Sequence, residues 1–285
     1  MDAARGLCKM LSMASSEWQL AAPSNASPLS RAGLRFGDRG THGTRTIMLA
    51  ELAELLAATT PDAPRTTHAE AVIEQNVLGK ATATTRRTTN QRLGELYALD
   101  PRVPLFRVVR RVWDVDVPGR PLIALLCALA RDPLLRTTAQ PVLATPVGAE
   151  LVRATLLDAM RAAVGARMNP AVLDKVARNA ASSWAQSGHL EGRMRKIRRR
   201  VAPTPGAVAL ALWLGALEGL AGEALLRCRW IRVFDVTPGE LMAPMLRAKQ
   251  LGLIHVRFGG DVVEIDAQRL DPAVRPERVA AREQA

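Results

Sequence analysis

The residues best suited to chemistry are polar side chains in the front half of one predicted helix and in the turn before it. They lie in the segment that ends at Leu99, and they are Lys80, Thr84, Arg86, Arg87, Asn90 and Arg92. Arginine, asparagine and threonine hydrogen-bond to base edges or hold phosphates, and a recognition helix enters the major groove with its N-terminal residues. The pattern therefore favours contact with nucleic acid, and a solvated helix face is the alternative.

Two further segments concentrate basic side chains suited to phosphate contact. The first is a helix expected over 103–115, in which Arg107, Arg110 and Arg111 lie among apolar residues. The second is the run GRMRKIRRR at 192–200, with Arg193, Arg195, Lys196, Arg198, Arg199 and Arg200. Clusters of this kind are typical of phosphate-binding surfaces. The second run has two other interpretations, a solvated connector and a helix lying against the body with its charges outward.

No pattern in the sequence indicates catalysis or metal binding. The histidines share no spacing with carboxylates or cysteines: His42, His68, His189 and His255. The three cysteines are far apart and form neither a disulfide framework nor a zinc pattern, which favours a reducing, cytoplasmic setting. There is no Walker motif and no nucleophile elbow. We therefore expect no enzyme activity, no catalytic residue, no metal and no cofactor.

The charge of the chain points to a polyanionic partner. The 285 residues include 39 Lys or Arg and 27 Asp or Glu, for a net charge of +12. Nucleic acid is the first candidate partner and an acidic membrane surface the second, while a coding bias towards arginine is the alternative explanation. The most apolar segment, 206–217, is shorter than the roughly 20 residues needed to cross a bilayer. We therefore expect no membrane span.

Three helices are expected to position the polar front half. The first covers 44–58, and the second begins at the capping-box pair Thr67 and Glu70. Gly79 can turn the chain, and the third helix can begin at Thr82 or Thr84 because a threonine oxygen accepts a free N–H of the first turn. Its back half carries three side chains that can anchor it to a core, namely Leu93, Leu96 and Tyr97.

The rest of the chain is predicted to be mainly helical. Residues 122–130 are apolar nearly all round and predict a core helix. A later helix is expected from Thr237 towards Gln250, with a kink at Pro244. Alternating apolar residues around Gly259-Gly260 then predict a hairpin with a two-residue turn.

The expected fold is a mainly α helical bundle with helix-turn-helix-like or winged-helix-like N- and C-terminal units and one short C-terminal β-hairpin. Five parts are expected along the chain. They are a disordered tail at 1–43, an N-terminal helix-turn-helix-like domain at 44–118, a central helical region at 119–201, a C-terminal winged-helix-like unit at 202–270 and a tail at 271–285.

The chain resembles the BrxA-like small proteins of bacterial BREX phage-defence systems. One group of matching residues is Asn76-Val77-Leu78, Lys80, Thr84 to Arg87, Arg92-Leu93 and Leu96. A second match is TPGELMAPMLRAKQLGLI at 237–254, and the resemblance covers roughly 44–268. It implies a helical core with helix-turn-helix or winged-helix parts, and binding to double-stranded DNA as an accessory of the defence machinery. The run at 193–200 and Pro244 depart from the pattern.

Two functions remain open from the sequence. The first is a double-stranded-DNA-binding accessory protein, in which the basic residues above contact DNA. The second is a helical adaptor that docks other defence proteins without contacting DNA. Exposed tryptophans would distinguish the adaptor, and the four candidates are Trp113, Trp184, Trp213 and Trp230. A third option, RNA binding, is disfavoured because aromatic residues make up only 4% of the chain.

Overall fold

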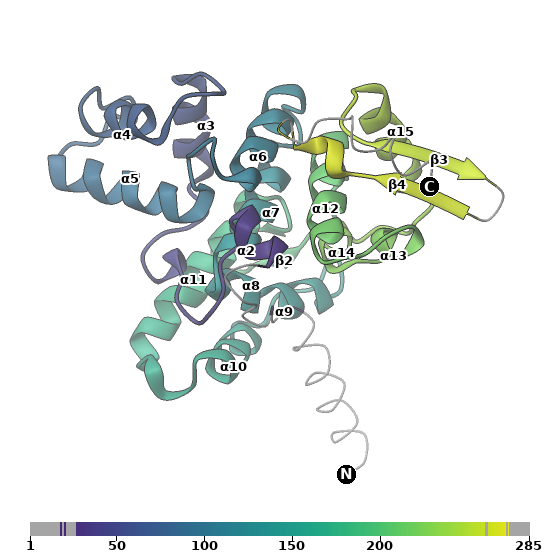
Figure 1. Ribbon diagram of the computed structural model, residues 1–285. Helices are drawn as coiled ribbons and strands as arrows, with labels where there is room; N and C mark the ends of the chain where they lie inside the picture. The colour runs from purple at the N-terminus through teal and green to yellow at the C-terminus, as the bar shows by residue number, and fades with distance from the viewer. Residues whose placement is uncertain (1–17, 19, 21–26, 260–261, 272, 274–285) are drawn as a thin grey trace, which may run out of the picture.

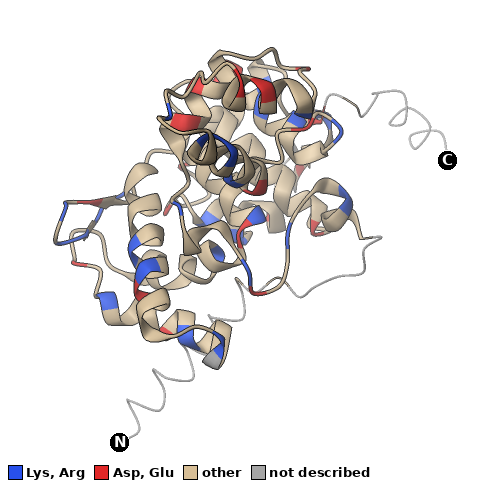
Figure 2. Cartoon of the chain, turned by 90° about the vertical axis from the view of Figure 1, so that its left-hand side faces the viewer, with Lys and Arg blue, Asp and Glu red and all other residues tan. Residues whose placement is uncertain are grey.

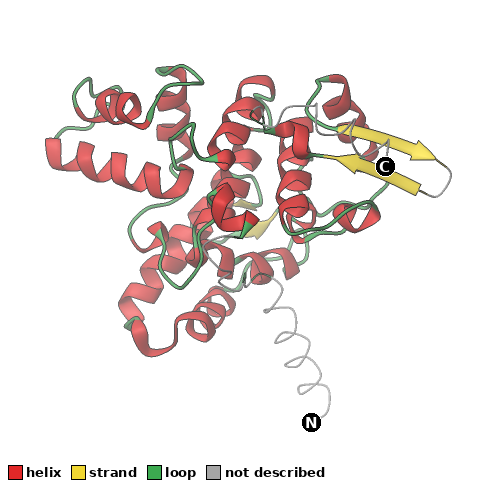
Figure 3. Ribbon diagram, in the orientation of Figure 1, coloured by secondary structure: helices red, strands yellow, loops and turns green. Residues whose placement is uncertain are grey.

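The protein is mainly helical with a hairpin near its C-terminus, as the sequence predicts (Figures 1 and 3). The computed structural model describes residues 18, 20, 27–259, 262–271 and 273. The α-helices are α2 (Pro28–Ala32), α3 (Leu49–Ala57), α4 (Arg65–Ile73), α5 (Ala83–Tyr97), α6 (Pro104–Val115), α7 (Arg120–Arg131), α8 (Pro133–Thr137), α9 (Ala139–Ala144), α10 (Arg153–Val164), α11 (Pro170–Gln186), α12 (Pro205–Leu217), α13 (Glu223–Leu226), α14 (Arg229–Arg232) and α15 (Met242–Gln250). The short 3₁₀ helices are η1 (Thr41–Gly43), η2 (Gly165–Arg167) and η3 (Gln268–Leu270). The strands are β1 (Leu190–Glu191), β2 (Ile197–Arg198), β3 (His255–Gly259) and β4 (Val262–Asp266).

Helices α7 and α12 form the centre of the core. Every residue from Leu122 to Ala130 and from Gly206 to Gly215 is buried. Both segments lack a polar face, and a helix that is apolar all round is stable only when other elements surround it. Helix α12 accordingly packs against α6, α7, α14 and α15, while α7 also contacts α5, α8 and α11. The predicted core helix at 122–130 is confirmed.

A buried carboxylate joins α6 to the start of α12. Asp116 follows the last turn of α6 and is 5% exposed. One of its oxygens accepts the Gly206 N–H at 2.7 Å, and the other accepts the Gly119 N–H at 3.1 Å. Any Cβ atom at either glycine would lie within 2.7 Å of Asp116 atoms, so both positions need glycine. The contact fixes the entry of α12 into the core.

Helices α3, α4 and α5 follow one another at the upper left of Figure 1. Helix α3 begins at Leu49 rather than Thr44, and α4 begins at Arg65 after Pro64 rather than at the expected capping box of Thr67. Pro64 is the residue before the helix, so its fixed backbone angle sets the start instead.

Helix α5 agrees with its prediction. Thr82 is its N-cap, and the Thr82 Oγ1 atom accepts the Thr85 N–H at 3.1 Å. Leu93, Leu96 and Tyr97 are fully buried. Gly79 turns the chain before this helix with φ +58°.

The prediction of a disordered tail over 1–43 is wrong for residues 27–43. These residues form α2 and η1, and Ala32, Leu34 and His42 are buried. The glycine-rich run is held in place because Gly40 packs directly against the Asp132 carboxylate, where a Cβ atom would clash. Trp18 is also buried. Most of the remaining tail, 1–17, 19 and 21–26, lies outside the described residues.

The basic run at 192–200 is not a helix: residues 192–196 form the mostly exposed connection between two short antiparallel strands, and Ile197–Arg198 is the second of these strands. Leu190 pairs with Arg198 and Glu191 pairs with Ile197. Residues 148–151 add backbone hydrogen bonds along β2, among them the Arg198 N–H to the Ala149 carbonyl oxygen at 2.8 Å. We refer to residues 190–198 as the β1–β2 arm.

The C-terminal part has the expected order of helix and then hairpin. Helix α15 begins at Met242, so Pro244 lies in its first turn, where no intrahelical N–H bond is lost and no kink results. In the hairpin Val256 pairs with Ile265 and Gly259 pairs with Val262. The two residues between the strands are therefore 260–261 rather than the predicted Gly259-Gly260. Asp271, expected in a tail, is buried and anchored, while 272 and 274–285 lie outside the described residues.

The division into units stays a prediction. One continuous hydrophobic cluster includes residues from all three expected central parts, among them Leu52, Leu125 and Val256. Among the described residues, no helix combines the length and the apolar character required to cross a membrane.

Candidate nucleic-acid interface

The front half of α5 is partly exposed. Helix α5 runs inwards from the left edge of the molecule in Figure 1, so its N-terminal end lies furthest from the core. Thr84, Arg87 and Gln91 are exposed and recur at three- and four-residue steps, which places them on one face of the helix. Arg87 forms no hydrogen bond or ion pair with any described residue. Its guanidinium is therefore available to an external anion.

The other predicted residues of this unit are partly engaged. Lys80 forms an ion pair with Glu51 at 3.1 Å, and the Asn90 Oδ1 atom accepts a hydrogen bond from Arg65 at 2.8 Å. Arg86 is half-buried, and its Nε atom is enclosed without a hydrogen-bond partner among the described residues.

Arg92 is held by an acidic neighbour on the same helix. It forms an ion pair with Glu95 at 2.7 Å. Burial raises the pKa of Glu95, but hydrogen bonds from Arg92, Thr41 and Gln91 outweigh burial and lower it. Arg92 therefore faces a charged carboxylate.

The three arginines of α6 do not form a phosphate-binding surface, which corrects the prediction for them. Arg107 donates to both oxygens of Asp271, at 2.9 and 2.7 Å. Arg110 is 6% exposed and donates to the carbonyl oxygens of Leu56 and Thr59. Arg111 donates to backbone carbonyls near η3 and at Gly252. All three hold α6 against neighbouring segments through these hydrogen bonds.

Arg198 also has an interior role, contrary to prediction. It is 0% exposed, donates to the Val142 and His189 carbonyl oxygens at 3.1 and 3.3 Å, and forms an ion pair with Asp235. Burial lowers the pKa of the Arg198 guanidinium, and Asp235 opposes that shift.

The remaining members of the basic run lie on the surface and mostly have partners. Arg195 pairs with Glu150 at 2.6 Å and Arg199 with Glu191 at 2.5 Å, and Arg200 pairs with Glu240. The Lys196 Nζ atom donates to a backbone carbonyl at 2.6 Å. Arg193 is exposed and forms no hydrogen bond or ion pair within the described chain. Exposed ion pairs contribute little, about 0–1 kcal/mol, so these arginines can exchange partners at small cost.

The excess positive charge lies in the central part of the chain. Residues 44–118 carry ten basic and nine acidic side chains, whereas residues 119–201 carry fourteen basic and only five acidic ones. In Figure 2 Lys and Arg are distributed over several elements with Asp and Glu between them. Residues 44–118 as a whole are therefore close to neutral, although α5 and α6 themselves carry six basic side chains against two acidic ones, and most of the net charge lies in 119–201.

A buried histidine cluster was not indicated by any spacing in the sequence. His42 Nδ1 lies 2.8 Å from Asp132 Oδ2, and His42 Nε2 lies 2.8 Å from Ser183 Oγ. The order Asp–His–Ser is that of hydrolytic triads. His42 and Ser183 are 0% exposed and Asp132 is 1% exposed, so a substrate has no access to them. Through these contacts His42 holds the segment before α3 against α8 and α11.

The charges of two buried groups follow from their surroundings. Burial raises the pKa of Asp132, but attraction to His42 and hydrogen bonds from His42 and Leu135 outweigh burial and lower it. Burial lowers the pKa of His189 to about 3, so this histidine is neutral at physiological pH. His189 Nε2 lies 2.8 Å from the Val233 carbonyl oxygen. Both groups stabilise the fold from the interior.

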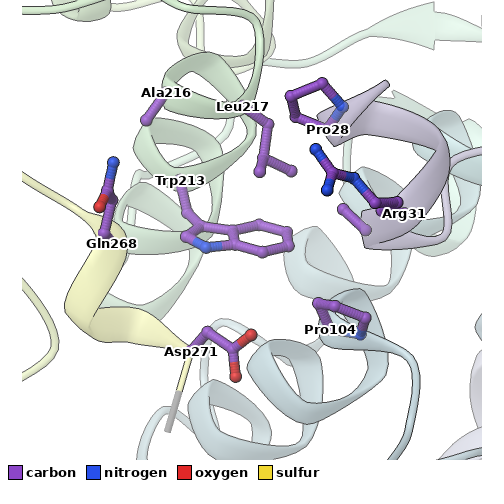
Figure 4. A pocket seen from close by; sticks show the side chains of 9 residues that line it. Pro28, Arg31, Pro104, Trp213, Ala216, Leu217, Gln268 and Asp271 are labelled. Carbon is purple, nitrogen blue, oxygen red and sulfur yellow. The ribbon is translucent and has the colours of Figure 1, made fainter. Parts of the chain in front are cut away.

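A pocket of about 360 Å³ lies where α2, α6, α12 and η3 meet. Figure 4 shows the Trp213 ring in its middle, with Arg31 and Leu217 on one side and Asp271 and Pro104 on the other. Its lining is mainly apolar, and Asp271 is already held by an arginine of α6. The pocket lies away from α5 and takes no part in the predicted interface.

The exposed tryptophans expected of a docking adaptor are not found. The four candidates are all in the core, with exposed fractions of 1% for Trp113, 0% for Trp184, 4% for Trp213 and 0% for Trp230. Within the part of the chain that the structure describes, no group of three His, Cys, Asp or Glu side chains could hold a metal ion. Comparison with protein-family models, curated proteins and solved structures gives no significant match.

Proposed function

We propose that the chain is a non-enzymatic protein that binds double-stranded DNA, with α5 as the helix that enters the major groove. The observation that carries the proposal is the exposed polar front half of α5, in which Arg87 has no partner among the described residues. The buried back half of the helix keeps this front half fixed in direction. A preorganised helix loses little entropy when it binds.

In this proposal the central segment 119–201 supplies most of the phosphate attraction. Its exposed cations include Arg153, Lys175, Arg178 and Arg193. Phosphate contacts release counterions from DNA, so affinity falls steeply with salt and depends little on sequence. Base contacts from α5 add any sequence preference.

We further propose that this binding serves as an accessory activity in a bacterial phage-defence system of the BREX type. The support is the resemblance of 44–268 to BrxA-like proteins, which includes the segment that forms α15. The protein partners would be other components of that system. The adaptor function without DNA contact has less support, because the tryptophans that would anchor a partner are buried.

The test is the affinity of the full chain for a fluorescently labelled duplex, measured by anisotropy with RNA as competitor. We expect Arg87→Ala to weaken binding about fivefold or more and to reduce the salt slope by about 1. Arg102→Ala is the matched control, because Arg102 is an exposed arginine that follows the C-terminal end of α5 and is paired with Asp100. Wild-type affinity in the Arg87 variant would remove α5 from the proposal.

A further inference from the structure

The tip of the β1–β2 arm presents an apolar side chain between two arginines. Met194 is 90% exposed, the largest exposed fraction among the large hydrophobic residues of the described chain. Arg193 and Arg195 flank it and are both exposed. Gly192 allows the tight turn with φ +99°, and a Cβ atom there would clash with the Arg195 carbonyl oxygen.

The base of the arm is rigid. Arg198 fixes β2 in the core through the Val142 and His189 carbonyl oxygens. The Leu151 N–H donates to the Lys196 carbonyl oxygen at 2.8 Å, which ties the neighbouring segment to the arm. The loop itself is closed by Lys196 Nζ, which donates to the Gly192 carbonyl oxygen at 2.6 Å. The exposed Met194 is therefore held in place by the hydrogen bonds of the arm.

The partner that fits this tip must offer anions on both sides of an apolar slot. Duplex DNA has that arrangement, because phosphates border each groove and stacked base pairs lie between them. Methionine is among the side chains that proteins insert between base steps from the minor groove, with arginines alongside. A protein or lipid partner would be expected to meet a wider apolar surface than one side chain.

We propose that the β1–β2 arm is a DNA-kinking wedge, in which Met194 inserts between adjacent base pairs while Arg193 and Arg195 contact the bordering phosphates. The inference rests on the proposed DNA binding and extends it to a second contact that deforms the duplex. On binding, Arg195 leaves its ion pair with Glu150 and contacts a phosphate instead. Loss of this exposed ion pair costs little free energy. Glu150, which pairs with Arg195, and Asp235, which pairs with the buried Arg198, are the acidic side chains paired with arginines of the arm.

The test compares the bend of a duplex with the affinity for it. A duplex labelled at both ends reports the bend by energy transfer, and 2-aminopurine within it reports unstacking. With saturating full-length protein, we expect the wild type to shorten the end-to-end distance and to raise the 2-aminopurine signal. Met194→Ala should lose most of both changes while its affinity falls less than about tenfold. Met242→Ala is the control, since this methionine is also exposed, at 38%, but lies on α15.

The outcomes separate the wedge from DNA binding itself. Tight, salt-dependent binding without bending, or equal bending by wild type and Met194→Ala, would overturn the wedge and leave the role of α5 intact. Absence of duplex binding at low salt would overturn both. Binding to phosphatidylserine vesicles that is lost in Met194→Ala, with DNA bending unchanged, would assign the tip to membranes instead.

Discussion

Replacement of Arg198 tests whether this arginine, unlike the exposed Arg193 of the same nine-residue run, has an interior role. Arg198→Met keeps the apolar stem but removes a guanidinium that donates to two buried carbonyl oxygens and pairs with Asp235. Removal of one partner from a buried ion pair costs about 3–5 kcal/mol, because the other charge stays without compensation. For a chain of this size each kcal/mol lowers Tm by about 2 °C, so we expect a loss of roughly 6–10 °C.

Urea denaturation followed by circular dichroism measures the loss of unfolding free energy, and a thermal melt measures the fall in Tm. Two further variants test the cause of the loss. Arg193→Ala is the matched control, because it removes an exposed arginine of the same run and should change stability by less than about 0.5 kcal/mol. Adding Asp235→Asn to Arg198→Met should recover part of the loss, since the unpaired carboxylate is then gone. A destabilisation below about 1 kcal/mol in Arg198→Met would refute the interior role of this arginine.

Two further predictions concern buried titratable groups. His189 has a pKa of about 3 in the folded protein, so below pH 6.5 only the unfolded chain binds its proton, and stability falls as the pH falls. Between pH 7 and 5 the wild type should lose roughly 2 kcal/mol more than His189→Gln in urea titrations, and parallel pH profiles would contradict this. Burial raises the pKa of Cys127 to about 12 and that of Cys228 to about 11. In a Cys8→Ser variant at pH 8, neither thiol should react with a thiol reagent until denaturant is added, and rapid labelling of the native protein would show that one is accessible.

Local signals in the sequence were sufficient to predict several elements. The start of α5 was predictable because a threonine cap acts within three residues, and its anchors because leucines recur at helical spacing. The burial of α7 and α12 followed from their lack of a polar face. The alternation of apolar residues predicted β3 and β4, although the turn is shifted by one residue.

The roles of individual arginines were not predictable, because they depend on partners far along the chain. Arg110 donates to a carbonyl 54 residues away, and Arg198 pairs with a carboxylate 37 residues away. A weak signal existed for Arg110, which lies four residues after Phe106 and three before Trp113, at the border of the apolar face of α6. Arg198 has no such signal, since five other basic residues surround it in sequence.

The packing of residues 27–43 was also not predictable, because it too depends on partners far along the chain. A glycine-rich segment with few apolar residues has the composition of a flexible tail. His42 is fixed by Asp132, 90 residues away, and by Ser183, 141 residues away. Such a cluster depends on three elements meeting in space, which no local spacing reveals.

The affinity of the wild-type chain for a labelled duplex, measured across a salt series with RNA competitor, tests whether the protein binds DNA. We expect binding that survives the RNA and weakens linearly in a log–log plot, with a slope of about −4.5 or steeper if five or more phosphates are contacted. No binding at low salt, or an affinity that salt does not change, would contradict DNA binding as the function of this protein.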